Sequence, residues 1–462
     1  MATENQRQPS KLEKPINGKR LLFFSLPIQG HMTPMLQLAD ILHSKGFSVT
    51  FIHTKFNSPN PSNYPHFTFQ PISDNLSEAE TSGLSVFDLA YLINAKCVAP
   101  FRDCLDQLFS DSSEKRPFAG LISDPALHFT REVAKSFQLQ RFVLRTSGTG
   151  AFRAFSSFPL LQEKGYLPIQ DARSEEPVEE LPPLRIKDLP VITTSHPEKL
   201  YRLLEGMIQE TKASSGIIWN SFEELEESSL AKLRQDFQIP MFPIGPFHKH
   251  FAASSSSLLA EDHSSISWLD KQAPNSVIYV SFGSIAAIEE KDFLEVAWGL
   301  ANSRHPFLWV VRPGLIRGVE WLEPLPEGFL ESLDGKGHIV KWAPQLEVLA
   351  HPSVGAFWTH NGWNSTLESI CEGVPMICTP CFTDQLVNAR YVSHVWKVGV
   401  QLENGLSRER IEMVIKRVME EKEGEEVRER VLHLQEKANL CVQPAGSSHE
   451  SLKSLVNYIS LF

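Results

Sequence analysis

The sequence predicts an α/β protein built from two doubly wound parallel sheets, and two observations support this prediction. Short apolar runs that suit β-strands alternate with segments of helical periodicity through most of the chain, as expected where helices cover both faces of a parallel sheet. At 462 residues, the chain is too long for one ordinary core and suits two domains with a connecting segment.

The first strand and helix form the clearest unit. Residues 21–26 are an apolar run, and apolar residues then recur at helical spacing over residues 35–42. We expect Thr33 to cap this helix and Pro34 to occupy its first turn. His31 would then lie in the loop between the strand and the helix.

A polar, serine-rich stretch, AASSSSLLAEDHSS, begins at residue 252 and suits a linker. The alternation of strands and helices restarts after it. We therefore predict a first domain over residues 1–250, a linker over 251–265 and a second domain over 266–446. The remaining residues, 447–462, form an amphipathic helix that could pack on either domain.

Charge and hydropathy exclude several classes of partner. The net charge of −11, from 44 basic and 55 acidic residues, predicts a surface that repels nucleic acid and anionic membranes. The N-terminus lacks the apolar core of a signal peptide, and no window reaches the ~18 uninterrupted apolar residues of a membrane span. We expect no nucleic-acid partner, no membrane insertion and a cytoplasmic location.

The six cysteines are too few and too unevenly spread for a disulfide framework. Cys371, Cys378 and Cys381 could join His351 or His360 in a metal site. Two of these cysteines lie in or beside the apolar run VPMIC, which reads as a buried strand. We therefore expect no bound metal.

Residues 342–385 contain the strongest site signal. The run VGAFWT reads as a buried strand that ends at His360, and a helix starts directly after it. Ligands bind at such junctions in open α/β sheets, and the free N–H groups of the helix N-terminus suit a phosphate. Asn364 and Ser365 add donors in the first turn, and Glu368 could accept the hydroxyls of a ribose.

Each part of this stretch also has a purely structural interpretation. Asn364 or Ser365 could simply cap the helix, Trp342 could be a core residue, and Asp384 could begin the next helix. Taken together these interpretations are disfavoured, because the polar side chains cluster at strand ends within one short stretch.

The first domain carries a candidate catalytic pair. His31 follows the first strand, where the positive end of the helix dipole favours the neutral imidazole that acts as a base. The run PFAGLISD reads as a strand that ends at Asp124, so both side chains would emerge from the same edge of one sheet. An aspartate beside a histidine fixes its tautomer and stabilises the imidazolium. The alternative is that His31 caps a turn and Asp124 caps a helix.

The sequence resembles plant secondary-product UDP-glycosyltransferases over nearly the whole chain. The resemblance rests on WAPQ, HNGWNS, Glu368, GVP and the closing DQ of residues 342–385, and on QGHMTP and the later SD in the first half. It implies the GT-B fold, two Rossmann-like domains facing across a cleft. It assigns His31 and Asp124 as the catalytic pair. Asn361 stands where many relatives have cysteine, and we attach no functional change to it.

The resemblance also implies a role for each residue of the donor site. Trp342 would stack on uracil, the backbone of Ala343 would read its edge, and Gln345 and Glu368 would hold the ribose. The residues that would hold the diphosphate are Gly283, Ser284, His360, Gly362, Asn364 and Ser365. Those that would contact the sugar are Trp363, Asp384 and Gln385, and Thr146 and Ser147 are further possible donor contacts.

The activity implied by the resemblance is glucosyl transfer from UDP-glucose with inversion, which gives a β-glucoside or a glucose ester. Trp363 and Gln385 are the residues that go with glucose in this family. The acceptor would be a small plant metabolite, such as a hormone- or defence-related acid, a cytokinin, a phenolic or a terpenoid. The first domain, which would include the returning helix 447–462, would bind this acceptor. The protein would act as a monomer without a cofactor.

Two other functions stay open at this point. The chain could be a UDP-sugar isomerase or epimerase of the same architecture, or a UDP-sugar sensor without catalysis. The acidic residues 223–227 suggest a solvated helix face. Arg153, in the aromatic-rich stretch AFRAFSSFPL, is the side chain to consider if the acceptor is an acid, although it also suits a solvated position.

Overall fold

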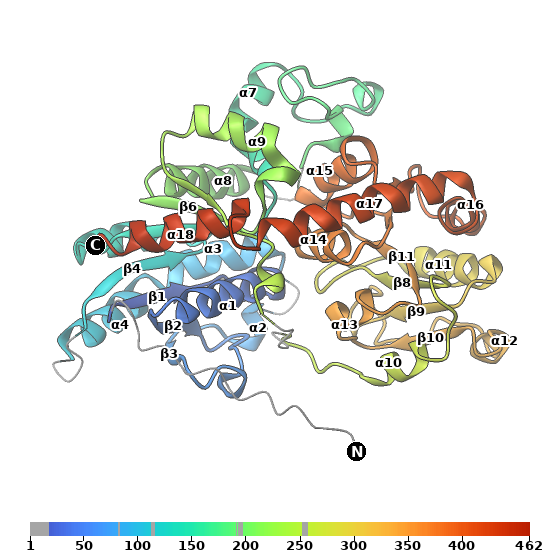
Figure 1. Ribbon diagram of the computed structural model, residues 1–462, viewed down its shortest axis with the longest axis horizontal. Helices are drawn as coiled ribbons and strands as arrows, with labels where there is room; N and C mark the ends of the chain where they lie inside the picture. The colour runs from blue at the N-terminus through green and yellow to red at the C-terminus, as the bar shows by residue number, and fades with distance from the viewer. Residues whose placement is uncertain (1–17, 82–83, 112–115, 191, 193–196, 252–256) are drawn as a thin grey trace.

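The computed structural model describes residues 18–81, 84–111, 116–190, 192, 197–251 and 257–462. These residues form two parallel sheets that lie side by side, each between layers of helices (Figure 1). The predicted α/β class with two doubly wound sheets is confirmed. Residues 1–17 of the predicted first domain and residues 252–256 of the predicted linker lie outside the described part of the chain.

The N-terminal sheet has seven strands in the order β3-β2-β1-β4-β5-β6-β7. Its strands are β1 (Arg20–Phe24), β2 (Ser48–Thr54), β3 (Thr68–Ile72), β4 (Phe118–Ser123), β5 (Arg141–Arg145), β6 (Gly216–Trp219) and β7 (Met241–Pro243). The helices between them are α1 (Gln29–Ser44), α2 (Glu78–Thr81), α3 (Val86–Lys96), α4 (Val98–Ser110), α5 (Thr130–Ser136), α6 (Thr149–Ser156), α7 (Phe158–Glu163), α8 (Pro197–Lys212) and α9 (Glu223–Asp236).

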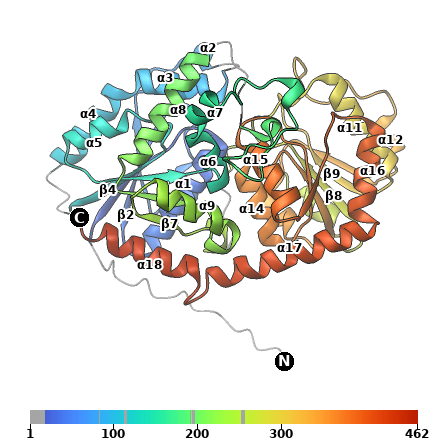
Figure 2. The same cartoon turned by 90° about the horizontal axis from the view of Figure 1, so that it is seen from above.

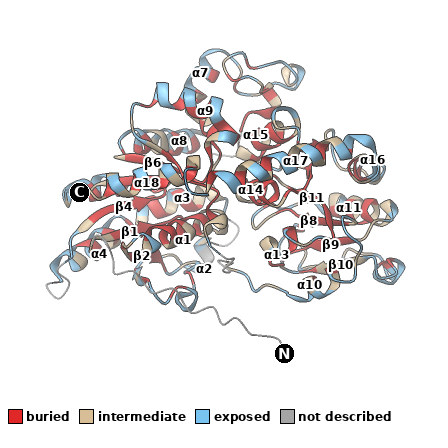
Figure 3. Ribbon diagram, viewed as in Figure 1, coloured by how far each residue is buried: buried red, intermediate tan, exposed pale blue. Residues whose placement is uncertain are grey.

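Alternation along β1 shows how the sheet is buried on both faces. Leu21 and Phe23 pack into one apolar cluster with α1. Leu22 and Phe24 pack into a second cluster with α3, α4 and α5. Successive side chains of a strand point to opposite faces, so a run that is apolar throughout requires helices on both sides. Figure 3 shows both sheets as buried layers inside partly exposed helices.

The C-terminal sheet has six strands in the order β10-β9-β8-β11-β12-β13. Its strands are β8 (Val277–Ser281), β9 (Phe307–Val310), β10 (Gly337–Val340), β11 (Val354–Thr359), β12 (Met376–Cys378) and β13 (Gly399–Gln401). Its helices are α10 (Ser264–Leu269), α11 (Glu290–Ser303), α12 (Phe329–Ser332), α13 (Gln345–Leu349), α14 (Trp363–Glu372), α15 (Asp384–Arg390), α16 (Arg408–Met419) and α17 (Lys422–Cys441).

The last helix, α18 (Ser447–Ile459), crosses from the second sheet to the first. Figure 2 shows α17 along the C-terminal half and α18 along the N-terminal half of the molecule. Three apolar side chains of α18 are buried in the cluster that also holds Leu21 and Phe23: Leu452, Leu455 and Ile459. The N-terminal core is therefore completed by the end of the chain. Among the described helices, none is long and apolar enough to cross a membrane.

The predicted start of the first helix is wrong. Helix α1 begins at Gln29 rather than after Thr33, so His31 lies in its first turn and Pro34 lies inside the helix. A proline interrupts a helix because it cannot donate to the carbonyl four residues back, which here belongs to Gly30. That carbonyl instead accepts a hydrogen bond from Asn364 of the other domain, at 3.1 Å. A contact from a distant part of the chain therefore satisfies the group that the proline leaves free.

Candidate active site

A single cleft between the domains contains every residue that the sequence singled out for catalysis or donor binding. It lies at the carboxyl ends of the strands where each strand order reverses, between β1 and β4 in one sheet and between β8 and β11 in the other. Ligands bind at these points in doubly wound sheets. A cavity of about 330 Å³ suits small molecules rather than a macromolecule.

His31 and Asp124 form a hydrogen-bonded pair on the N-terminal side of the cleft. Nδ1 of His31 lies 2.5 Å from Oδ2 of Asp124, and Oδ1 of Asp124 accepts from the backbone N–H of Ala126 at 2.9 Å. Asp124 is fully buried, whereas His31 is partly exposed to the cleft. A carboxylate on Nδ1 fixes the proton there, so Nε2 is the nitrogen that can take a proton from a substrate.

Electrostatics keep Asp124 ionised. Burial by itself would raise the pKa of this carboxyl, but the charge and hydrogen bond of His31, the N–H of Ala126 and the charge of Arg145 together lower it. The ionised form is the one that stabilises a histidine cation. The pair can therefore act as a general base toward a hydroxyl group in the cleft.

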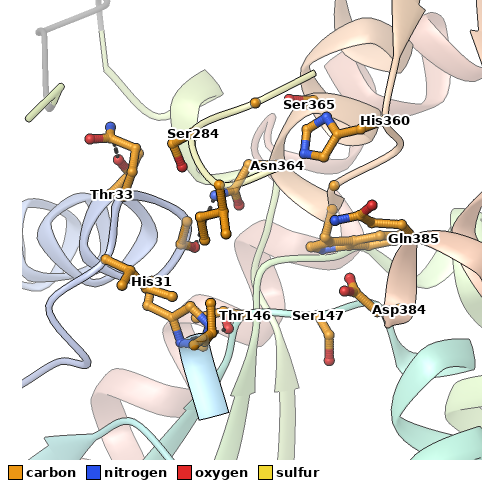
Figure 4. A pocket seen from close by; sticks show the side chains of 18 of the residues that line it. His31, Thr33, Thr146, Ser147, Ser284, His360, Asn364, Ser365, Asp384 and Gln385 are labelled. Carbon is orange, nitrogen blue, oxygen red and sulfur yellow. Dashed lines mark hydrogen bonds between the residues drawn. The ribbon is translucent and has the colours of Figure 1, made fainter. Parts of the chain in front are cut away.

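The N-terminus of α14 lies on the opposite side of the cleft without a side-chain cap. Gly362 occupies the N-cap position and, because it has no side chain, makes no cap hydrogen bond to the first turn. Its N–H groups are free for an anionic ligand. Asn364 and Ser365, in the same turn, and His360, just before it, also line the cleft. Figure 4 shows these side chains facing His31 from the other domain.

His360 is a neutral hydrogen-bonding group in this position. Burial lowers its pKa to about 4, although a backbone interaction with Ser281 partly opposes this effect, and its Nδ1 atom is buried without a hydrogen-bond partner among the described residues. Gly283 leaves room for the ring, because a Cβ at this position would meet Cε1 of His360 at 2.5 Å, and its φ of +73° also favours glycine. An unpaired buried nitrogen beside an uncapped helix end is consistent with a phosphate ligand.

The predicted ribose ligands are joined to each other. Nε2 of Gln345 donates to Glu368 at 2.6 Å and lies 3.0 Å from Oγ of Ser365, and Tyr279 donates to Oε1 of Gln345 at 3.2 Å. Burial raises the pKa of Glu368 to about 7. A ribose would therefore meet a preorganised group of acceptors and donors. Trp342 and Ala343 line the adjacent part of the cleft.

The three residues that were predicted to contact the sugar differ in which of their polar atoms remain available to a ligand. Oε1 of Gln385 accepts from the N–H groups of Cys381 and Phe382 at 2.9 and 3.2 Å, which leaves its amide nitrogen for a ligand. Asp384 accepts from Thr383 and Asn388. Trp363 is 3% exposed and donates to the carbonyl of Asn220 at 2.8 Å, so the edge of its ring also joins the two domains.

Thr146 and Ser147 directly follow β5, near the His31–Asp124 pair. Oγ1 of Thr146 is 3.3 Å from Nδ1 of His31, and Ser147 and Asp384 line the same cleft from opposite domains (Figure 4). Oγ of Ser147 is buried without a hydrogen-bond partner among the described residues. Of the two hydroxyls, that of Thr146 is the one that lies against the ring of His31.

The predicted solvated face at residues 223–227 is wrong for one residue. Glu226 is 4% exposed and accepts from the N–H groups of Thr149 and Gly150, both at 3.1 Å, and from Ser221 at 2.7 Å. It caps α6, the helix that follows the segment carrying Thr146. A run of acidic residues is normally solvated. The N–H groups that compensate for the burial of Glu226 belong to residues far away in the sequence, so this exception is seen only in the fold.

The apolar wall of the cleft and two arginines were not predicted from the sequence, except that the stretch AFRAFSSFPL, which could line an apolar pocket, contributes Phe155. The wall comes from the N-terminal domain and contains Ile28, Val86, Phe87, Ala90, Phe155, Leu203, Leu204 and Met207.

Arg312 donates to the carbonyls of Gly283 and Ala286 and so holds the turn after β8. Arg145 lines the cleft, whereas Arg153 is not among the lining residues. Scattered apolar residues on several helices give no sequence signal for a pocket.

No group of three or more His, Cys, Asp or Glu side chains that could hold a metal ion occurs among the residues that the structure describes.

Asn361, which stands where many relatives have cysteine, is fully buried. It donates to Sγ of Cys378 at 3.3 Å rather than entering the cleft.

Two facing domains, an uncapped helix N-terminus and a histidine–carboxylate pair across one cleft are the arrangement expected of a transferase that uses a nucleotide-linked donor. Residues 73–436 match the family model described as UDP-glucoronosyl and UDP-glucosyl transferase. The chain is 53% identical over 442 residues to UDP-glycosyltransferase 76B1 of Arabidopsis thaliana, a match covering 96% of this chain and 98% of that protein.

Solved structures agree with this match. UGT71G1 of Medicago truncatula, complexed with UDP-glucose, is 26% identical with a TM-score of 0.80 over 96% of this chain and 98% of that one. Phytolacca americana UGT2, complexed with UDP-2fluoro-glucose and pterostilbene, is 26% identical with a TM-score of 0.81 over 96% and 99%. The chain belongs to the UDP-glycosyltransferase family and is a glycosyltransferase of the GT-B fold. The comparisons give no support to the isomerase or sensor alternatives.

Proposed function

We propose that this enzyme transfers glucose from UDP-glucose to a hydroxyl or carboxyl group of a small metabolite, with inversion at the anomeric carbon. The position of the His31–Asp124 pair opposite the N-terminus of α14 carries the proposal. Asn364, in the first turn of α14, contacts Gly30, the neighbour of His31. A diphosphate bound at that N-terminus would therefore hold its sugar close to the base.

The reaction would be a direct displacement. Nε2 of His31 takes the proton of the acceptor hydroxyl, the acceptor oxygen bonds to the anomeric carbon, and the bond to UDP breaks as UDP leaves with the electron pair. Asp124 stabilises the imidazolium. Attack opposite the leaving group converts the α-linked donor into a β-glucoside. An ionised carboxyl acceptor would need no base and would give a glucose ester.

The charge that develops on the departing diphosphate would be stabilised by the N–H groups of α14, His360 and Ser365. Preorganised donors of this kind can replace a metal ion, so we propose metal-independent transfer without a cofactor. Glucose is the proposed sugar because Trp363 and Gln385, the residues that go with glucose in this family, both line the cleft, and because a structural relative was solved with UDP-glucose.

The apolar wall of the cleft favours a small acceptor with an apolar body, such as a phenolic, a terpenoid or a hormone- or defence-related acid. One structural relative holds pterostilbene together with a fluorinated donor. We also propose that the enzyme works as a cytoplasmic monomer.

A UDP-release screen tests the proposed donor and reaction. Purified enzyme would be incubated with UDP-glucose, UDP-galactose or UDP-glucuronate and a panel of phenols, acids and terpenoids, with the products identified by mass spectrometry and NMR. We expect the fastest UDP release with UDP-glucose and a β-configured product. Faster release with another donor would contradict glucose, and a changed sugar without an acceptor product would indicate an isomerase.

The variant His31→Ala tests the base. Loss of the proton acceptor should lower kcat for hydroxyl acceptors by about 10²–10⁴-fold, while the Kd for UDP, measured by calorimetry, should change little because the diphosphate site lies in the other domain. Equal losses in turnover and in UDP affinity would assign His31 a structural role instead.

A further inference from the structure

Thr383 has a backbone conformation that is rare for its residue type. Its φ of +58° and ψ of −134° fall where glycine is the favoured residue, and a β-branched side chain makes this conformation unfavourable. Backbone strain of this kind persists only where the surrounding structure enforces it, and it gathers at functional sites. Thr383 lines the cleft and directly precedes Asp384 and Gln385, two of the residues that were predicted to contact the sugar.

The hydroxyl of Thr383 is used for Asp384 and not for the helix. Thr383 occupies the N-cap position of α15, where a threonine side chain normally accepts from the N–H groups of the first turn. It makes no such cap hydrogen bond. Its Oγ1 instead donates to Oδ1 of Asp384 at 2.8 Å. The hydroxyl therefore orders the carboxylate of the next residue rather than the end of the helix.

Asn388 holds the other oxygen of the same carboxylate. From one turn further along α15, its side-chain nitrogen donates to Oδ2 of Asp384 at 3.1 Å and to the carbonyl of Asn361 at 2.9 Å. Asn388 is 2% exposed, so its amide depends on these two acceptors. Asn361 directly follows His360. Asn388 therefore ties the carboxylate to the turn that precedes α14, the helix whose N-terminus forms the proposed diphosphate site.

The carboxylate of Asp384 is ordered by these contacts and still able to accept from a ligand. Each carboxylate oxygen can accept about two hydrogen bonds, so one from Thr383 and one from Asn388 leave capacity for hydroxyl groups. Asp384 is partly exposed and lines the cleft. Burial raises the pKa of this carboxyl, whereas the hydrogen bonds from Thr383 and Asn388 and the charge of His31 oppose the rise and so favour the ionised acceptor.

We propose that Thr383 and Asn388 are positioning residues for the transferred sugar, and that they set the enzyme's choice between epimeric donors by holding the Asp384 carboxylate in one orientation. A carboxylate that is held at both oxygens accepts from hydroxyls in fixed directions. An epimer whose hydroxyl points elsewhere leaves this acceptor unpaired, whereas a carboxylate that can rotate would meet either epimer. This inference rests on the proposed transfer from UDP-glucose, with Asp384 at the sugar.

The test separates the hydroxyl of Thr383 from the shape of its side chain. Thr383→Val keeps the branched shape and removes the hydroxyl, and Thr383→Ser keeps the hydroxyl. Each full-length variant would be assayed by UDP release with UDP-glucose and with UDP-galactose, its C4 epimer, and with the acceptor that the unmodified enzyme uses fastest. The readout is the ratio of kcat/KM for UDP-glucose to that for UDP-galactose.

We expect Thr383→Val and Asn388→Ala each to lower this ratio by about tenfold, as for a lost hydrogen bond to a charged group, because the loss falls on the sugar that the fixed carboxylate fits. Thr383→Ser should retain the ratio. The Kd for UDP, which lacks the sugar, should stay unchanged when measured by calorimetry. Ser393→Ala is the matched control and should behave like the unmodified enzyme, because it removes a hydroxyl that bonds to Ala389 and His394 just after the same helix.

Thermal melting with and without UDP would verify that each variant is folded, and if Asn388→Ala does not fold, the two Thr383 variants decide. Three results would overturn the inference: an unchanged ratio in Thr383→Val, an equal loss in Thr383→Ser, or a rise in the Kd for UDP that matches the loss of kcat/KM, which would make the role structural. Faster transfer from UDP-galactose by the unmodified enzyme would contradict the proposed glucose, but the inference would still require that preference to fall in Thr383→Val. Absence of UDP release with every donor and acceptor would instead contradict the proposed function.

Discussion

At the scale of single residues, burial decides the protonation of the groups in the cleft. Glu368 is 8% exposed, and burial raises its pKa to about 7, an effect that the hydrogen bond from Gln345 only partly opposes. Between the ordinary value of 4.5 and about 7, the folded protein holds a proton that the unfolded chain has released. This residue's contribution to stability therefore falls as pH rises through that window.

We predict that UDP-glucose binding depends on the protonation of Glu368. Ribose hydroxyls donate hydrogen bonds, so they favour the ionised carboxyl, and the Kd for UDP-glucose should decrease about tenfold between pH 6 and pH 8. Calorimetry over this range measures the dependence. Glu368→Gln should bind more weakly at pH 8 and show a nearly flat profile. A profile that keeps its slope in the variant would assign the titration to another group.

The residues that the sequence predicted and those that it missed differ in a physical way. His360 and Asp124 directly follow apolar runs, and a strand end is a property of the local sequence. Arg145 also ends a strand, but its burial in the cleft is set by side chains that lie far away in the sequence. Glu226 depends on N–H groups of a helix that lies far away in the sequence. Distant partners leave no local pattern.

At the scale of elements, the junctions between strands and helices position the chemistry. The predicted helix after VGAFWT begins at Trp363, and its N-terminus faces the cleft. The start of α1 could not be predicted in the same way, because a proline normally marks the first turn. The carbonyl of Gly30, which Pro34 cannot serve as a donor, accepts from Asn364, and this contact from the other domain is not visible in the local sequence.

Helix α6 should depend on Glu226 for its stability. Glu226→Ala would leave the N–H groups of Thr149 and Gly150 and the hydroxyl of Ser221 without their acceptor in a buried setting, and we expect a loss of about 2–4 kcal/mol in the free energy of unfolding. Urea denaturation followed by circular dichroism measures it. Glu227→Gln changes the exposed neighbour and should leave the urea midpoint unchanged. Similar midpoints for both variants would contradict the capping role.

At the scale of the whole molecule, the two domains are joined by specific contacts as well as by the chain. Lys249 pairs with Glu372 at 2.7 Å, and Arg185 pairs with Glu403 at 2.8 Å. Trp363 reaches Asn220. Since the base and the anion site come from different domains, these contacts set the distance across which glucose would be transferred.

Helix α18 also joins the two domains, because it follows α17 of the second domain and packs in the core of the first. A change at the end of the chain should therefore destabilise the N-terminal domain. Leu455 is fully buried in the cluster that holds Phe142, Phe242 and the side chains of β1. Leu455→Ala should therefore lower the free energy of unfolding by about 2–5 kcal/mol, as measured by urea denaturation. UDP should still raise the melting temperature, because its proposed site lies in the other domain. Asn457→Ala, on the exposed side of the same helix, serves as the control and should match the unmodified protein. A Leu455→Ala variant as stable as this control would show that the N-terminal core does not need the returning helix.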